Sequence, residues 1–154
     1  MRRILLRLLK RVRNSFLWIW YQQGSPAERA RGLAVGVFSG CFPLFGFQSL
    51  LGLGLASLFK GNHLLAIAGT WISNPFTYIP LYWFNYKVGA FCLGNDTQLH
   101  KWEGFFQTQI WNQGWKISSR ILLGSGIVGL FSGLAIGVAF YILFKALSNK
   151  NTVI

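Results

Sequence analysis

An apolar stretch at residues 32–95 dominates the chain, and proline interrupts it twice, at Pro43 and at Pro75. Its only charged residues are Lys60 and Lys87. Soluble domains of ordinary composition have about 25% charged residues, whereas this chain has 12% and is 53% hydrophobic. The stretch therefore predicts an all-α membrane protein. Because proline leaves backbone groups unpaired in a layer without water, the fold must shelter or use those groups at both breaks.

The chain is strongly basic, with 15 lysine and arginine residues against three acidic ones and a net charge of +12. Such a balance favours one of two partners, nucleic acid or the anionic surface of a membrane. A nucleic-acid-binding protein would surround its basic patch with polar surface, but here the neutral stretches are apolar. We therefore expect a lipid bilayer with anionic headgroups as the partner, and no nucleic acid.

Residues 1–24 carry the pattern of a basic amphipathic helix, with apolar residues at helical spacing and basic residues largely on the opposite side. This pattern is typical of a helix in the headgroup layer, and a topology signal or an organelle transit peptide is the alternative. Eight of the 15 basic residues lie in the first 31, which predicts a cytoplasmic N-terminus. The expected host is a bacterial inner membrane, with an organelle or thylakoid membrane as the alternative. The proposed membrane-surface residues are Arg3, Arg7, Lys10 and Arg11.

The first proline-broken block, residues 26–59, begins with a clear helix signal. Ser25 fits an N-cap, Pro26 fits the first turn, and Glu28 sits where it closes a capping box. We therefore expect a helix over residues 26–40.

The same block is broken at Pro43 and Gly46, and an apolar helix is expected to resume over residues 48–59. Neither half reaches the roughly 20 residues that a span needs. The block is either one kinked span or a re-entrant hairpin that enters and leaves on one side. A stripe of small residues on its first helix suits close helix packing, and consists of Gly32, Gly36 and Gly40.

The second block, residues 64–94, repeats the plan. Residues 64–73 form a half-length apolar helix, Asn74 is a good N-cap, and Pro75 is a good first residue of a second helix that is kinked at Pro80. Paired interrupted segments of this kind indicate a binding site in transporters.

A polar, aromatic interval follows at residues 95–120 and suits a surface helix or the aromatic belt beside a span. Residues 121–144 form an uncharged segment long enough to cross a membrane, and residues 146–154 are a tail. Kinked spans would give three crossings in all, whereas re-entrant hairpins would leave only the last. The segment carries a second glycine stripe, Gly129, Gly133 and Gly137.

Several motifs in residues 25–145 resemble the DUF2062 family of small bacterial membrane proteins. They are a Ser-Pro start, G-x-F-x-G-x-x-P-x-x-G-x-Q at residues 36–48, and T-W-x-S-N-P-x-T at residues 70–77, together with Asn62 and Gly89. Their combination is specific, although each alone is weak. The resemblance implies no established activity. Related domains occur attached to glycosyltransferases of envelope synthesis, which indicates lipid or envelope work by association alone.

The residues argue against catalysis and against any metal or cofactor. The apolar stretch contains no carboxylate and only His63 as a histidine, and no cluster of metal-ligating residues exists. The helix N-termini at the two breaks are better candidates, because their free N–H groups and dipoles attract anions. A site for an anion or a lipid phosphate is predicted there. The alternative is that the same side chains only satisfy the freed backbone. The residues in question are Gln48, Ser49, Asn74 and Thr77.

Two functions of different classes follow. The first is transport of a small solute or anion, or handling of a lipid phosphate, where the two broken helices meet. The second is a non-catalytic partner or scaffold subunit for an envelope or lipid-linked glycan enzyme. In that case the glycine stripes are docking faces for a second copy or a membrane enzyme.

Overall fold

The computed structural model describes residues 24–44, 46–94 and 110–150, and these residues form helices and turns without a strand. The predicted N-terminal surface helix, residues 95–109 of the polar interval and the last residues of the tail lie outside the described part. The all-helical prediction is confirmed for the part that is described. Its helices are α2 (Pro26–Gly40), α3 (Phe47–Leu58), α4 (His63–Thr70), α5 (Tyr78–Leu93) and α6 (Ile110–Lys150).

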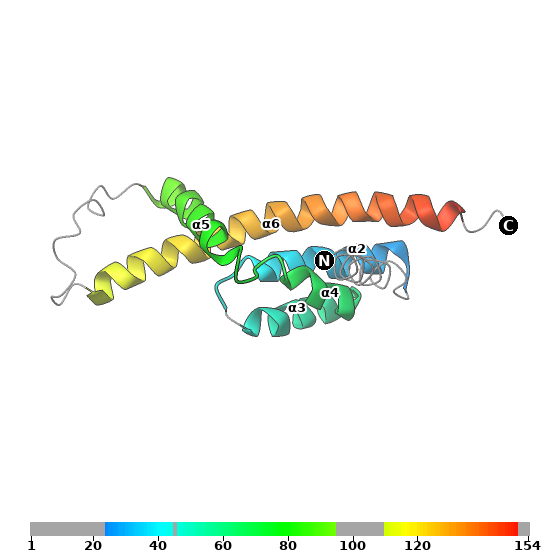
Figure 1. The fold of residues 1–154 in the computed structure, drawn as a ribbon, viewed down its shortest axis with the longest axis horizontal. Helices are drawn as coiled ribbons and strands as arrows, with labels where there is room; N and C mark the ends of the chain where they lie inside the picture. The colour runs from blue at the N-terminus through cyan, green and yellow to red at the C-terminus, as the bar shows by residue number, and fades with distance from the viewer. Residues whose placement is uncertain (1–23, 45, 95–109, 151–154) are drawn as a thin grey trace, which may run out of the picture.

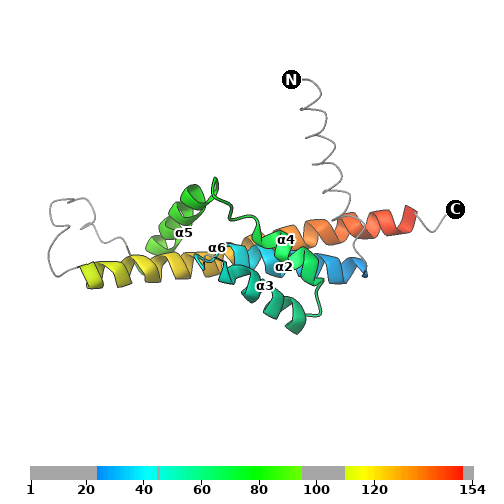
Figure 2. The same cartoon turned by 60° about the horizontal axis from the view of Figure 1, so that its bottom comes forward.

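The long helix α6 runs the length of the molecule, and the other helices pack beside it (Figure 1). α2 lies along the C-terminal half of α6, and α3 and α4 complete a small bundle on α2. α5 packs on the N-terminal half of α6, away from that bundle (Figure 2). The polypeptide therefore has two packing centres on one shared helix.

The start of α2 follows its local sequence code. The Ser25 hydroxyl accepts a hydrogen bond from the Glu28 N–H at 3.2 Å, and the Glu28 carboxylate accepts one from the Ser25 N–H at 3.1 Å. With Pro26 as the first helical residue, this is the capping box that the sequence predicts. The predicted helix over residues 26–40 is confirmed.

α3 folds back along α2, so the two helices form a hairpin and do not continue one another as a kinked span. Gly61, just after α3, packs on the backbone of Gly32, while Gly52 of α3 lies beside Ser39 at the other end of α2. Gly46 permits the reversal, because its φ of 87° lies in the left-handed region that favours glycine. Pro43 lies in the same connection.

The second block opens out instead of folding back. α4 packs on α2 and α3, whereas α5 leaves the bundle and packs on α6. α5 begins at Tyr78 with Thr77 as its N-cap, and so starts later than the predicted Asn74. Residues 74–77 form a turn of their own, closed by the Asn74 carbonyl, which accepts from the Thr77 and Tyr78 N–H groups at 2.9 and 3.0 Å. Pro80 falls in the first turn of α5, where a missing N–H removes no helical hydrogen bond.

α6 also begins earlier than predicted, at Ile110, inside the interval of residues 95–120. Gly114 is the weakest helix former in its first turns, and a single interior glycine costs about 1 kcal/mol relative to alanine. Packing against α5 stabilises this part, since Gly89 lies directly on the backbone of Arg120. With 41 residues, α6 is about 60 Å long at 1.5 Å per residue.

The two glycine stripes serve different contacts. Gly32 and Gly36 lie against the backbone of Asn62 and Ala66, at the start of α4, where a Cβ atom would collide. On the other side of α2, Gly133 lies against the backbone oxygen of Ala34. Both stripes are therefore occupied within the chain, the first by α4 and the second by α2. Gly40 packs on residues 70–72, at the end of α4. Gly129 and Gly137 of α6 pack on residues 30–41, which belong to α2 and the position that follows it.

The distribution of apolar and polar side chains between surface and interior is inverted relative to a soluble protein. The buried apolar residues are few and mostly small, such as Ala56 and Ala66, and buried polar side chains lie among them. By contrast, Phe76 is 92% exposed, Phe91 88% and Trp71 77%. Among the described residues one helix is long and apolar enough to cross a membrane, over Gly114–Ala146. The predicted apolar C-terminal helix is thus confirmed.

Candidate functional site

The first two predicted binding residues lie in the first turn of α3 and face α4. The buried Gln48 accepts a hydrogen bond at its Oε1 from the Ser73 hydroxyl at 3.0 Å. The Ser49 and Thr70 hydroxyls lie 3.3 Å apart and share a hydrogen bond. Both side chains therefore join the start of α3 to the end of α4.

The other two predicted residues satisfy the backbone of the second break. Asn74 Oδ1 accepts from the N–H groups of Phe76 and Thr77 at 3.0 and 3.1 Å. The Thr77 hydroxyl accepts from the Asn74 N–H at 2.9 Å and donates to the Ile72 carbonyl at 2.6 Å. These bonds close the turn around Pro75, so both side chains satisfy backbone groups that the break would otherwise leave unpaired.

The C-terminus of α2 is capped by side chains from a distant helix. Residues after Gly40 leave the helix, so carbonyl groups there have no partner in a following turn. Asn85 of α5 donates through Nδ2 to the Cys41 carbonyl at 2.9 Å, and the Tyr82 hydroxyl donates to the Phe42 carbonyl at 3.3 Å. The one sequence signal for this role is an asparagine within the mostly apolar α5.

These contacts form one network, which we call the polar junction. The Asn85 Nδ2 group also donates to the Ser125 hydroxyl of α6 at 2.9 Å. The Tyr82 hydroxyl also interacts with the side chain of Ser73. The two proline breaks therefore do meet, through neutral side chains. The polar junction consists of the Cys41 and Phe42 carbonyls with Gln48, Ser73, Tyr82, Asn85 and Ser125.

The polar junction suits a structural role better than an anion site. The Ser73, Tyr82 and Asn85 donors of the junction reach carbonyl or hydroxyl oxygens of the chain itself. The buried atom that no group satisfies is Asn85 Oδ1, an acceptor. An acceptor takes a hydrogen bond from a donor and repels an anion. Within the described residues there is also no group of three or more side chains that could hold a metal ion.

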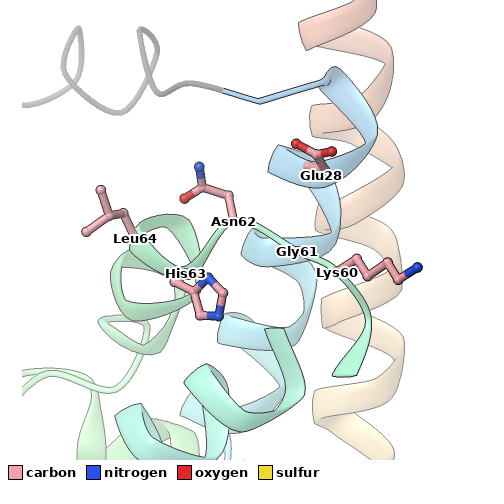
Figure 3. Close-up of a pocket in the computed structure, with 6 residues that line it drawn as sticks. All are labelled: Glu28, Lys60, Gly61, Asn62, His63 and Leu64. Carbon is pink, nitrogen blue, oxygen red and sulfur yellow. The ribbon is translucent and has the colours of Figure 1, made fainter. Parts of the chain in front are cut away.

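A second candidate lies at the opposite end of the bundle, where α2 begins and the turn between α3 and α4 passes over it. A pocket of about 460 Å³ is lined there by polar and charged groups. Lys60 points away from His63 and Leu64 in Figure 3, so the side chains spread rather than converge on one centre. The His63 ring is 2.8 Å from the Ser57 hydroxyl. The lining residues are Glu28, Lys60, Gly61, Asn62, His63 and Leu64.

This end of the molecule is basic. Arg29 lies over the ring of Phe144, which brings the end of α6 beside the start of α2. Arg31 and Lys60 are exposed and make no hydrogen bond or ion pair with described residues. We call Arg29, Arg31, Lys60 and Lys145 the basic end.

A protein-family model matches residues 9–152 of the 154, nearly the whole chain. The chain belongs to the DUF2062 family. That family is described as an uncharacterized protein conserved in bacteria. Comparisons with curated proteins and with solved structures gave no match.

The motifs that resemble DUF2062 come together in space. Gln48, the end of the first motif, bonds Ser73 of the second. Gly36 packs on α4, and Asn62 caps α4 by accepting from the Leu65 N–H at 3.0 Å. The DUF2062 motifs thus surround the hairpin and the break that follows it.

Proposed function

We propose that this DUF2062 protein is an integral membrane protein of the bacterial inner membrane that handles anionic lipids at its basic end. The inverted distribution of side chains carries the proposal. Exposed apolar surface of this extent is rare on soluble monomers, and here Phe76, Phe91 and Trp71 are more than three-quarters exposed. Lipid tails are as apolar as these side chains and solvate them.

The described basic residues support a position in the bilayer, because they fall into two groups. Along α6 the rise between Arg120 and Lys145 is about 37 Å at 1.5 Å per residue. The hydrocarbon core of a bilayer is about 30 Å thick, so the two groups suit opposite faces. The basic end forms one group, and the other consists of Lys87, Lys116 and Arg120.

Helix lengths support a different role for each proline-broken block. α2, at about 22 Å, is too short to cross, and α3 returns toward the basic end, so this hairpin is re-entrant. α4 starts at the basic end, and α5 continues to the level of Arg120, where Gly89 packs. The second block therefore crosses the membrane as a broken span, and α6 crosses back.

The orientation follows from charge. In this topology the four residues of the basic end share one face, while Lys87, Lys116 and Arg120 lie on the other. Cytoplasmic loops carry the excess of lysine and arginine. The basic end is therefore cytoplasmic, together with the N-terminus.

Lipid handling fits the basic end better than transport fits the polar junction. Anionic lipid attracts each basic residue near the surface by about 1 kcal/mol, and Arg31 and Lys60 are exposed for such contacts. The four predicted binding residues at the two breaks, Gln48, Ser49, Asn74 and Thr77, bond to the chain itself. The glycine stripes of the scaffold alternative are likewise occupied inside the chain.

The proposal is tested by purifying the full chain in a mild detergent and measuring the lipids that accompany it. We expect the protein to resist extraction by alkaline carbonate and to retain anionic phospholipids in excess of their share of the host membrane. Release by carbonate would contradict membrane integration. Retained lipids with the composition of the bulk membrane would contradict anionic-lipid handling.

A further inference from the structure

An apolar groove runs between α2, α3 and α6, and it lies apart from the polar junction. Its volume is about 400 Å³, and its walls are bulky residues of α3 and α6 around Ala34 of α2. Leu130, Leu134 and Phe59 are each more than half exposed along it. The residues that shape it are Ala34, Phe38, Leu55, Phe59, Leu130 and Leu134.

The groove has a direction. Arg31 lines one end of it, and that end belongs to the basic end of the molecule. Phe38, two turns further along α2, lies against Gly129 of α6. The groove therefore runs from an exposed guanidinium at the membrane surface toward the middle of the apolar layer.

We propose that this groove binds one molecule of an anionic phospholipid, with an acyl chain between α3 and α6 and the headgroup phosphate at Arg31. The inference rests on the proposed function and assigns the residues that would carry it. Arginine offers several N–H donors in a planar fork that matches phosphate geometry. Arg31 is exposed, and no described residue pairs with it. Lys60 follows Phe59 directly and adds a second cation at the same end.

Charge complementarity favours a lipid over a second copy of the chain. A second copy would have to offer an acidic partner to Arg31, but the chain has only three acidic residues against 15 basic ones. One of those three, Glu28, is engaged in the capping box of α2. A symmetric pair would also bring two basic ends together. An anionic phospholipid supplies both the apolar chain and the negative charge.

The test is native mass spectrometry of the full chain in detergent micelles doped with equal amounts of phosphatidylglycerol and phosphatidylcholine. Wild type is expected to retain one phosphatidylglycerol in severalfold excess over phosphatidylcholine. Arg31→Gln should abolish that preference. Leu130→Trp, which fills the groove from an exposed position, should reduce retention of both lipids severalfold. Lys87→Gln removes one positive charge far from the groove and should behave as wild type.

Each other outcome overturns the inference. An equal preference for phosphatidylglycerol in Arg31→Gln and Lys87→Gln would show that the headgroup is not held at Arg31. The proposed handling of anionic lipids would stand in that case. Unchanged retention in Leu130→Trp would exclude the groove as the seat of the acyl chain. Displacement of phosphatidylglycerol by inorganic phosphate would indicate a free-anion site, and a lipid-free dimer would indicate that a second copy fills the groove. No anionic preference in wild type would contradict the proposed function itself.

Discussion

Asn85 reaches back across 44 positions of sequence to hold the end of α2, with its Nδ2 2.9 Å from the carbonyl oxygen of Cys41. The same nitrogen donates to Ser125 of α6, so one amide joins three helices. Each partner would otherwise be a polar group without a bond in a region from which water is excluded.

Removing this amide should destabilise the protein. Asn85→Ala leaves the Cys41 carbonyl and the Ser125 hydroxyl unsatisfied, and a buried polar group left in that way costs about 1–3 kcal/mol. We expect a lower Tm in detergent, followed by the tryptophan fluorescence of the purified chain. Ser125→Ala should have a smaller effect. The matched control is Ser119→Ala, because the Ser119 hydroxyl bonds only to the Lys116 carbonyl one turn earlier on an exposed surface. Equal Tm values for all three variants would show that the Asn85 amide does not stabilise the fold.

Gly36 of α2 and Gly54 of α3 should respond differently to replacement by alanine, because the space around the two glycines differs. Gly36→Ala places a methyl group against the backbone of Ala66, whereas nothing lies within 4 Å of a Cβ added at Gly54. Overpacking of this kind costs about 1–3 kcal/mol, and Gly54→Ala should be neutral or stabilising by up to about 1 kcal/mol through helix propensity. The yield and Tm of the two purified variants test this difference. A stable Gly36→Ala protein would require α4 to sit further from α2 than it does here.

The hydrogen bond between Gln48 and Ser73 should contribute to stability and not to lipid binding. Gln48→Ala and Ser73→Ala each remove a buried hydrogen bond of 3.0 Å, worth about 1 kcal/mol net. Both variants should lose Tm and retain anionic lipid as wild type does. The measurement is a thermal melt beside the lipid retention described above. Normal Tm with lost lipid would instead restore the predicted ligand site at Gln48.

The topology makes a further prediction in whole cells. In a chain without its native cysteines, a cysteine at His63 should react from the cytoplasmic face, and one at Asp96 should react from the opposite face. His63 is exposed at the start of α4, and Asp96 lies outside the described residues. Accessibility to an impermeant maleimide before and after lysis distinguishes the faces. Labelling of both positions from one face would leave α6 as the only crossing.

The sequence predicts a structural element well where that element depends on residues close together in the chain. The capping box around Ser25 needs residues three apart, and the structure forms it. The second break was predicted less well, because Asn74 and Thr77 bond to one another and delay the start of α5 to Tyr78. A turn that closes on its own side chains competes with helix initiation.

Long-range partners were beyond prediction. The asparagine at position 85 is visible in the sequence, but its partners Cys41 and Ser125 lie 44 and 40 positions away. The same holds for the close approach of Gly89 to Arg120, which sends α5 to α6 and opens the second block. Glycine spacing indicated close packing, yet it did not say which helix each stripe would meet.

The polar junction is built entirely from groups that carry no charge at physiological pH, such as Gln48, Ser73 and Asn85. Moving a unit charge through the membrane potential is worth about 2.3 kcal/mol per 100 mV, and these side chains carry none. Rearrangement of the junction would therefore displace no gating charge there. In the proposed membrane position, we therefore expect the polar junction to keep its geometry in energised and de-energised cells alike.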